Sequence, residues 1–241
     1  MKLSIQTSAG AYYYNLKTLY IGVKKINKKI AKENLLLFKS LMDKQNISFG
    51  LIYGTLLGAI RENDFISHDE DIDLYMLEEN KELFLEKLFY LRKHGFEVAR
   101  YDKRGLLSII RNGEYIDIYF FSKFKKGVRI SSGLCVEESY LTNTTYLNFM
   151  GTSFLAPKES IRFLEFEYGK SWKTPIPYTD FKVSSKKIMM FKIKEHFKYL
   201  LPDFMYLRLI KINERKMIQD FEEKFTEESM YNENIPHYSH V

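Results

Sequence analysis

One stretch of the sequence, from Tyr53 to Tyr75, constrains this protein more than any other part. Near its end, four of the five residues at 69–73 are acids, and Asp71 and Asp73 flank Ile72. Carboxylates so close together repel one another, which raises the pKa of some of them, and burial beside apolar neighbours raises it further. Residues two apart on a β-strand point to the same face, so the two carboxylates are expected to project together. Because two carboxylates plus substrate phosphates commonly hold Mg²⁺ in proteins, the pattern predicts a divalent-cation site.

Two other interpretations of the acids remain open. The first is a solvated acidic turn beside an edge strand. The second is an EF-hand loop, which fits less well because no Gly follows the acids and no Glu arrives at the right distance. The Gly54-Thr55 pair and Arg61, which precede the acids, favour the cation site over the acidic turn.

The residues around the acids resemble the signature of the LicD family. The matching segments are YGTLLGAIR at 53–61, FI at 65–66 and HDEDIDL at 68–74. A shorter string, YGKSWKTP at 168–175, is similar to a second segment of that family, Tyr-Gly-x-x-Trp-x-x-Pro. The family comprises bacterial phosphocholine transferases and, more distantly, fukutin-type phosphoribitol transferases, within the nucleotidyltransferase-fold superfamily.

The sequence departs from the LicD pattern at three positions. Ser67 stands where the family usually has Pro, His68 where it often has Trp, and Glu70 where it has Asp. Asp71 and Asp73 are intact. The departures therefore bear on the substrate more than on metal binding.

By this resemblance the expected fold class is α+β, a mixed α/β domain of the nucleotidyltransferase type. A small twisted sheet would carry the acids, with helices packed on it and further helices at both ends. The expected domains are an N-terminal basic helical region at 1–34, a LicD-like catalytic domain at 35–181 and a C-terminal basic helical extension at 182–241.

Other segments carry simpler predictions. Residues 1–10 are expected to be poorly ordered, and a helical region is expected from Ala11 to Met42. The patterns predict a strand at 48–53 and a single amphipathic helix at 78–94. The last residues, 226–241, are polar and predict a loose tail.

The resemblance also implies roles for the acids. Asp71 and Asp73 would be catalytic and would hold Mg²⁺ or Mn²⁺, with Asp69 as a further metal ligand. Asp117 would be a third catalytic acid, which completes the metal site or takes a proton from the acceptor. The alternative for Asp117 is an ion pair with a nearby Arg or Lys at a sheet edge.

Asp117 lies in a predicted β-hairpin. The two arms, 106–110 and 115–121, are joined around Asn112-Gly113, which is a strong type I′ turn signal. In the second arm Asp117 points away from its neighbours Ile116 and Ile118. A single acid inside such a strand is unusual for an ordinary core.

Gly54 and Thr55 are candidate substrate-binding residues. They are expected to form a turn at the end of a strand, where the absence of a Cβ lets the backbone approach a phosphate. Exposed amides, a hydroxyl and the start of the following helix would all donate to that anion. The alternative is an ordinary helix start.

Arg61 and His68 complete the predicted substrate-binding set. A guanidinium pairs with phosphate oxygens through two hydrogen bonds, so Arg61 is a candidate phosphate ligand. Its alternative is a surface ion pair with Glu62 or Asp64. His68 adjoins the acids, where a packing or supporting role is favoured over a catalytic one.

The composition bounds the partners and the location. At 241 residues the chain suits one domain with helical additions, and its net charge of +6 favours anionic partners. The single Cys135 excludes an intramolecular disulfide and a cysteine-cluster metal site. The sequence has no apolar run long enough to span a membrane and no signal-peptide pattern at its start, so a cytoplasmic location is expected, with peripheral contact to the membrane as an option.

The C-terminal third is basic and helical, interrupted at Pro202. Its apolar residues alternate with lysines, which fits either a peripheral contact with an anionic membrane or helices that simply cover the catalytic domain. The lysines between Lys24 and Lys32 allow the same pair of interpretations, an anionic surface or a solvated helix face.

Resemblance and local chemistry together favour a transferase of phosphorus-containing groups. It would move a phospho-alcohol, such as phosphocholine or phosphoribitol, from a CDP-activated donor to a sugar hydroxyl of a cell-surface glycan or lipid-linked sugar, releasing CMP. The alternatives are a nucleotidyltransferase that uses an NTP on a small acceptor, and a non-catalytic scaffold associated with glycans or membranes. No nucleic-acid partner is expected, because the lysines are dispersed and the central site is acidic.

Overall fold

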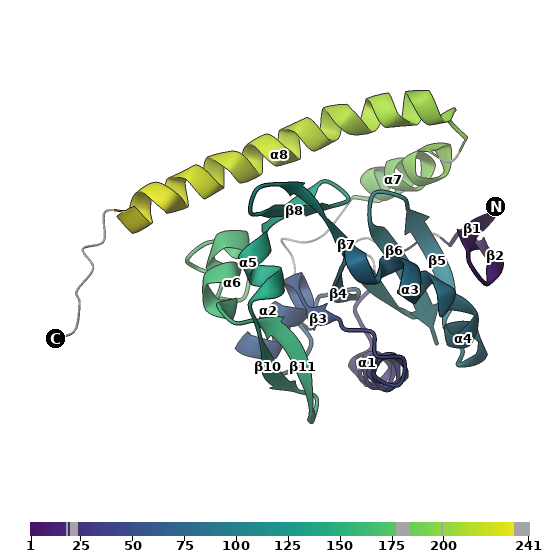
Figure 1. The fold of residues 1–241 in the computed structure, drawn as a ribbon, viewed down its shortest axis with the longest axis horizontal. Helices are drawn as coiled ribbons and strands as arrows, with labels where there is room; N and C mark the ends of the chain where they lie inside the picture. The colour runs from purple at the N-terminus through teal and green to yellow at the C-terminus, as the bar shows by residue number, and fades with distance from the viewer. Residues whose placement is uncertain (18, 20–23, 177–183, 199, 234–241) are drawn as a thin grey trace.

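The computed structural model describes residues 1–17, 19, 24–176, 184–198 and 200–233 (Figure 1). Its centre is a mixed sheet in which nine strands are hydrogen-bonded. The strand order is β10-β11-β3-β4-β7-β6-β5, with β8 paired to the far part of β7 and β9 paired to β8. The strands are β3 (Gly50–Leu51), β4 (Ile72–Leu77), β5 (Glu97–Asp102), β6 (Leu106–Arg111), β7 (Glu114–Lys125), β8 (Val128–Ser131), β9 (Leu134–Glu137), β10 (Thr144–Phe149) and β11 (Thr152–Pro157). The α+β class is confirmed, although the sheet is larger than the small one expected.

The two central strands, β4 and β7, run parallel to each other. Most residues of both are apolar, as expected for strands that are covered on both faces. Their register sets Asp73 beside Asp117. The predicted hairpin is confirmed, because β6 and β7 pair antiparallel and both Asn112 and Gly113 adopt positive φ, at 51° and 84°.

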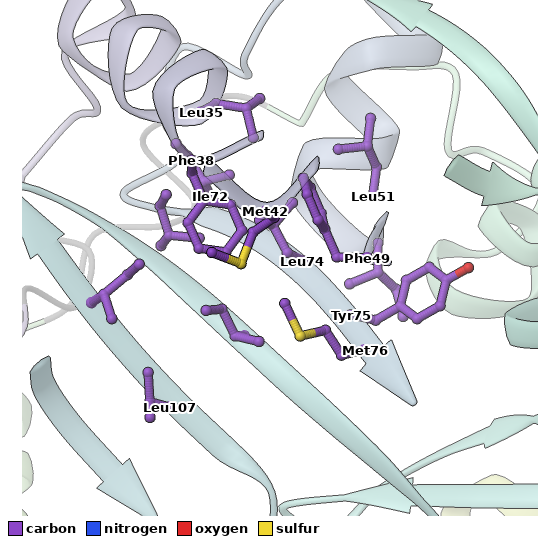
Figure 2. Packing of buried hydrophobic residues seen from close by; sticks show 14 of the residues in the cluster. Leu35, Phe38, Met42, Phe49, Leu51, Ile72, Leu74, Tyr75, Met76 and Leu107 are labelled. Atoms are coloured by element: carbon purple, nitrogen blue, oxygen red, sulfur yellow. The ribbon is translucent and has the colours of Figure 1, made fainter. Parts of the chain in front are cut away.

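Helix α1 (Lys28–Asp43) packs its apolar stripe against this centre. Figure 2 shows Leu35, Phe38 and Met42 of α1 over Ile72 and Leu74 of β4. The ring of Phe38 makes an edge-to-face contact with Phe49 at a centroid distance of 5.1 Å. The acid-bearing end of β4 therefore projects from one of the best-packed parts of the molecule.

The smaller helices lie around the sheet (Figure 1). They are α2 (Tyr53–Arg61), the 3-10 turn η1 (Glu78–Asn80), α3 (Lys81–Glu86), α4 (Leu88–Lys93), α5 (Glu138–Thr142) and α6 (Ser160–Tyr168). Two predictions are corrected here. The single helix expected at 78–94 is a 3-10 turn followed by two short helices, and the strand expected at 48–53 is limited to β3, since Tyr53 already belongs to α2.

The N-terminal region differs most from its prediction. In place of poor order and helix, β1 (Lys2–Thr7) and β2 (Gly10–Asn15) form an antiparallel hairpin. Tyr12 and Tyr14 are buried while Tyr13 between them is exposed, which is the alternation of a strand with one covered face. The basic helical region predicted for 1–34 is therefore wrong for 1–15 and right only from Lys28 onward.

Two helices follow α6 in the chain, α7 (Ser185–Lys198) and α8 (Asp203–Glu233). In Figure 1, α8 is a long rod along one side of the molecule, with α7 near its start. Residues 226–233 belong to α8, so the predicted loose tail is wrong there, and 234–241 lie outside the described residues. Within the described residues, none of the helices combines the length and the apolarity needed to span a membrane. The boundaries of the three predicted domains stay predictions.

Candidate active site

Three carboxylates meet at the start of β4. One oxygen from each of Asp69, Asp71 and Asp73 lies within 4.8 Å of the others. Asp69 and Asp71 are half-buried and Asp73 is buried, so the cluster sits at the rim of the core. The neighbouring Ile72 and Leu74 are fully buried, as the strand pattern predicted.

Asp73 is held by the first turn of α2. The Gly54 amide donates to its Oδ2 at 3.1 Å, and the amide of Asp73 itself donates to Thr55 Oγ1 at 2.8 Å. The residue that caps α2 is Ile52, whose side chain cannot accept a hydrogen bond. Asp73 therefore provides from β4 the acceptor that a helix start requires, and the helix dipole in turn favours its negative charge.

Gly54 is required by the acids themselves. A Cβ at this position would lie 2.5 Å from Asp69 Oδ2 and 3.1 Å from Asp73 Oδ2. The absence of a Cβ at Gly54 thus leaves room for the carboxylates of Asp69 and Asp73. The sequence instead predicted that a phosphate approaches the backbone here. Gly54 and Thr55 also lie within α2, not in a turn before it.

Thr55 is fully engaged inside the protein. It is only 1% exposed, and its oxygen accepts the hydrogen bond from Asp73. This position fits a residue that fixes the strand carrying the acids. Direct donation by Thr55 to a substrate, as the sequence suggested, stays a prediction that this geometry does not favour.

The carboxylates destabilise one another. Burial raises the pKa of Asp69 to about 6. Burial, followed by repulsion from Asp73, Asp117 and Asp69, raises the pKa of Asp71 well above its ordinary value. Burial also raises the pKa of Asp73, against the opposing effect of the Gly54 amide. A divalent cation among these oxygens would remove the repulsion.

Asp117 lies on the same side of the sheet, on β7. One of its oxygens accepts a hydrogen bond from Arg100 Nη2 at 2.8 Å, and the other accepts a short one from the Ser108 hydroxyl. The ion pair that was kept as an alternative is therefore present, but on a central strand and not at a sheet edge. Asp117 is not one of the three residues whose oxygens cluster within 4.8 Å. Its role as a metal ligand stays a prediction.

Arg61 and His68 lie at the far end of α2 from Gly54. Arg61 Nη2 pairs with Glu62 at 2.7 Å, and Nη1 donates to the carbonyl oxygen of Trp172 at 3.1 Å. Its Nε is buried without a hydrogen-bond partner among the described residues, as is Nε1 of Trp172. Burial, and then the charge of Arg61, lower the pKa of His68. The ion pair with Glu62 is the one that the alternative interpretation of Arg61 predicted. The predicted contact of Arg61 with a phosphate stays a prediction.

Tyrosines that the sequence reasoning missed surround the acids. The Tyr119 hydroxyl hydrogen-bonds to Asp73 and lowers its pKa. The Tyr53 ring meets the Tyr119 ring edge to face at 5.2 Å, and the Tyr53 hydroxyl is buried with no partner among the described residues. Tyr53 also adopts φ of +47°, a backbone conformation that costs energy in a non-glycine residue.

Two of these missed residues carried a signal. Tyr119 follows Asp117 by two positions on one strand, so both face the same way. The type I′ turn at Asn112-Gly113 fixes the register of the hairpin, and counting outward from it sets Ser108 opposite Asp117. The partner Arg100 had no such signal, because it lies on β5, outside the hairpin whose register that turn fixes.

The residues present suit a divalent cation with oxygen ligands. Asp69, Asp71 and Asp73 offer only carboxylate oxygens, which Mg²⁺ and Mn²⁺ accept. The raised pKa values of Asp69 and Asp71 mark charges that lack compensation in the protein alone. The fit therefore rests on donor chemistry and on electrostatics together.

Comparison with known families supports both the class of fold and the family. Residues 46–159 match the family described as LicD/FKTN/FKRP, nucleotidyltransferase domain. The class is that of nucleotidyltransferase-type α+β domains, as the sequence predicted. The part of the chain that matches the LicD family, just under half of it, contains the acid cluster, Asp117 and the first turn of α2.

Individual relatives fit the same family. The ribitol-5-phosphate transferase FKTN of Homo sapiens is 25% identical over 171 residues, which is 67% of this chain and 37% of that protein. The lipopolysaccharide cholinephosphotransferase LicD of Haemophilus influenzae is 42% identical over 52 residues, which is 22% of this chain and 20% of that protein. The chain thus spans little more than a third of the length of the FKTN relatives it matches.

A solved structure of the lincosamide antibiotic adenylyltransferase LnuA with lincomycin bound aligns over 71% of this chain and 97% of that chain. Its identity is 12% and its TM-score is 0.44. A likeness at this level supports no conclusion about function.

Proposed function

We propose that this protein is a metal-dependent phosphotransferase. It transfers a phospho-alcohol, of the phosphocholine or phosphoribitol kind, from a CDP-activated donor to a sugar hydroxyl of a surface glycan or lipid-linked sugar. The acceptor oxygen forms a bond to the phosphorus that carries the alcohol, the bond from that phosphorus to the bridging oxygen breaks, and CMP leaves. The reaction takes place on the cytoplasmic side of the membrane.

One observation carries the proposal: three carboxylates, in the segment that matches the LicD family, converge within 4.8 Å at the start of the central strand β4. Asp71 and Asp73, joined by Asp69, would hold Mg²⁺ or Mn²⁺. The ion would neutralise the diphosphate and the departing phosphate. The names of the two relatives, a ribitol-5-phosphate transferase and a cholinephosphotransferase, support the kind of group transferred.

The other residues have supporting parts in this proposal. Asp117 takes the proton of the acceptor hydroxyl once substrate contact loosens its bonds to Ser108 and Arg100. The unpaired Nε of Arg61 is the donor left for a phosphate oxygen. Gly54 and Thr55 act on the substrate through Asp73, whose position they fix.

Binding measurements test the donor. We would measure thermal shifts and calorimetric affinities for CDP-choline, CDP-ribitol, CDP-glycerol, CTP and ATP, each with and without Mg²⁺. We expect one CDP-alcohol to bind more tightly with Mg²⁺, and Asp73→Asn to abolish that gain. The matched control is Asp43→Asn, which removes an exposed carboxylate that pairs with Lys39.

The other outcomes point elsewhere. Mg²⁺-dependent binding of CTP or ATP without any CDP-alcohol would favour a nucleotidyltransferase. If a protein that unfolds cooperatively bound none of the five compounds, this would contradict the proposed transferase function and favour a non-catalytic scaffold.

A further inference from the structure

The C-terminal helices expose many large apolar side chains. We define the arm as the described residues between 184 and 217, which comprise α7 and the first half of α8. Its most exposed apolar residues are Ile193 (58%), Leu200 (70%), Phe204 (72%) and Ile212 (60%). Soluble surfaces seldom gather so many, so a patch of this kind marks a contact with something else.

The exposed apolar side chains of α7 share one face of the helix. At about 100° per residue, the exposed Met189, Met190, Ile193 and Phe197 fall within roughly one third of the helix circumference. Lys192 and Lys194 lie on the two flanks of that arc. An apolar stripe bordered by lysines is the pattern of a helix that lies in a membrane interface.

Charge is divided sharply along the C-terminal region. Residues 184–217 contain nine Lys and Arg against three Asp and Glu, a net charge of +6. Residues 218–233, which complete α8, contain one Lys against six Asp and Glu, a net charge of −5. Only the first half of α8 can therefore approach an anionic surface closely.

The face of α8 opposite its exposed apolar residues contacts the sheet. Glu214 pairs with Arg104 at 3.6 Å, and the Met217 sulfur lies close to Gly133 in the β8–β9 turn. Beyond the arm, Phe221 is buried with Val128 and Cys135. Because these contacts occupy the inner side, the exposed residues Phe204 and Ile212 face away from the body.

We propose that the arm is a docking surface for an anionic lipid membrane. Its lysines and arginines would meet anionic headgroups, and Ile193, Phe197 and Phe204 would enter the boundary between headgroups and acyl chains. The arm would thereby lie on the membrane surface. The proposal does not rest on the transferase activity, because it depends only on the exposed side chains and the charge of the arm.

A second copy of the chain fits this surface less well. Two arms would each bring a charge of +6 to the contact, which repels. Protein interfaces are also depleted of lysine, whereas lysines border the apolar arc here. A nucleic acid would use the basic residues but would leave the aliphatic ones in water.

Vesicle co-sedimentation of the full chain tests the proposal. The probes are vesicles of phosphatidylcholine alone and vesicles that contain phosphatidylglycerol as well. We expect binding to the anionic vesicles only. Ile193→Glu with Phe197→Glu should weaken it at least tenfold, and Lys192→Gln with Lys194→Gln should weaken it by about fivefold for each lysine lost.

The control is Tyr146→Glu, which places one such charge at a 74% exposed aromatic residue of β10. It should bind like the unaltered protein. Circular dichroism and the unfolding temperature verify that each variant is folded. Donor binding, measured without vesicles, should be equal in all of them, so that failure of this proposal is distinguishable from failure of the proposed function.

Three results would overturn the membrane surface. The first is an unaltered protein that stays in the supernatant with anionic vesicles. The second is equal binding by the arm variants and the unaltered protein. The third is a change from dimer to monomer in Ile193→Glu with Phe197→Glu by light scattering, with vesicle binding unchanged, which would assign the surface to a second copy.

Discussion

The acid cluster and the arm both concentrate charge of one sign, and they hold it in opposite ways. The acids are drawn into the rim of the core, where the Gly54 amide, the Tyr119 hydroxyl and the packing of β4 fix them. The basic residues of the arm lie outside, among exposed apolar side chains. A site that must hold an ion needs fixed charges with little water, whereas a surface that meets a membrane needs mobile charges and free apolar groups.

The two regions also differ in how they are attached. The strand that carries the acids is surrounded by the main hydrophobic core, which includes Phe38, Ile72 and Leu74. The arm is continuous with a helix held by a small separate cluster around Val128, Cys135 and Phe221. Substitutions in one region should therefore leave the other largely intact.

The largest effect is expected for Asp73→Asn. The change keeps the size of the side chain but removes one charge from the cluster, so the transfer rate should fall by about a thousandfold or more, equivalent to about 4 kcal/mol. A transferase assay with the donor found by binding measures this. Vesicle binding by the same variant should equal that of the unaltered protein, and a joint loss would mean that the two regions are coupled.

Core substitutions sharpen the difference in attachment. Phe38→Ala should lower the free energy of unfolding by about 3–5 kcal/mol, because it leaves a cavity among aromatic rings. Phe221→Ala should cost about 1–2 kcal/mol, because the small cluster at α8 can close around the loss. Urea unfolding measures both, and equal costs would show that α8 belongs to the main core.

Glycine substitutions separate function from stability within α2. Gly54→Ala would push against the carboxylates of Asp69 and Asp73, so activity should drop by about a hundredfold, or 2.7 kcal/mol, with little loss of stability. Gly58→Ala instead meets the Asp64 carbonyl oxygen at 2.5 Å, which is backbone and cannot swing aside, so it should mainly lower the unfolding temperature. A Gly54→Ala protein with full Mg²⁺ binding and activity would contradict the account of the cluster.

The smallest effect is the pH dependence of stabilisation by Mg²⁺. The pKa of Asp69 rises from its ordinary 3.8 to about 6 in the folded protein. Without metal, protonation of Asp69 therefore adds to the stability of the fold below pH 3.8, and this contribution is lost as the pH rises through 6. A cation competes with that proton. At ten times its Kd, Mg²⁺ should therefore add about 1.4 kcal/mol at neutral pH and much less near pH 5.

Thermal unfolding with Mg²⁺ or with Na⁺ at equal ionic strength measures this last prediction. For a chain of this size 1 kcal/mol corresponds to a shift of about 2–4 °C. The Asp73→Asn protein is the control and should show little shift at either pH. A shift that grows as the pH falls would contradict metal binding by the acids.

Short-range patterns of the sequence determined much of this protein. The alternation of acids with Ile72 and Leu74 predicted a strand with carboxylates on one face, and Asn112-Gly113 predicted the hairpin that carries Asp117. At 12–14 the sequence holds three identical tyrosines, so no alternation signals the strand there and the predicted helix is wrong. These features depend on residues a few positions apart, where the backbone period alone sets which side chains share a face.

The tertiary structure decided what the site residues contact. Gly54 and Asp73 are 19 positions apart, and only the packing of α2 against β4 shows that this glycine serves the carboxylates. The partner of Asp117 is Arg100 from another strand, and Arg61 reaches the carbonyl of Trp172, more than a hundred positions away. Such contacts depend on how distant elements share the core, because a buried polar group takes whichever partner the surrounding packing brings within hydrogen-bond distance.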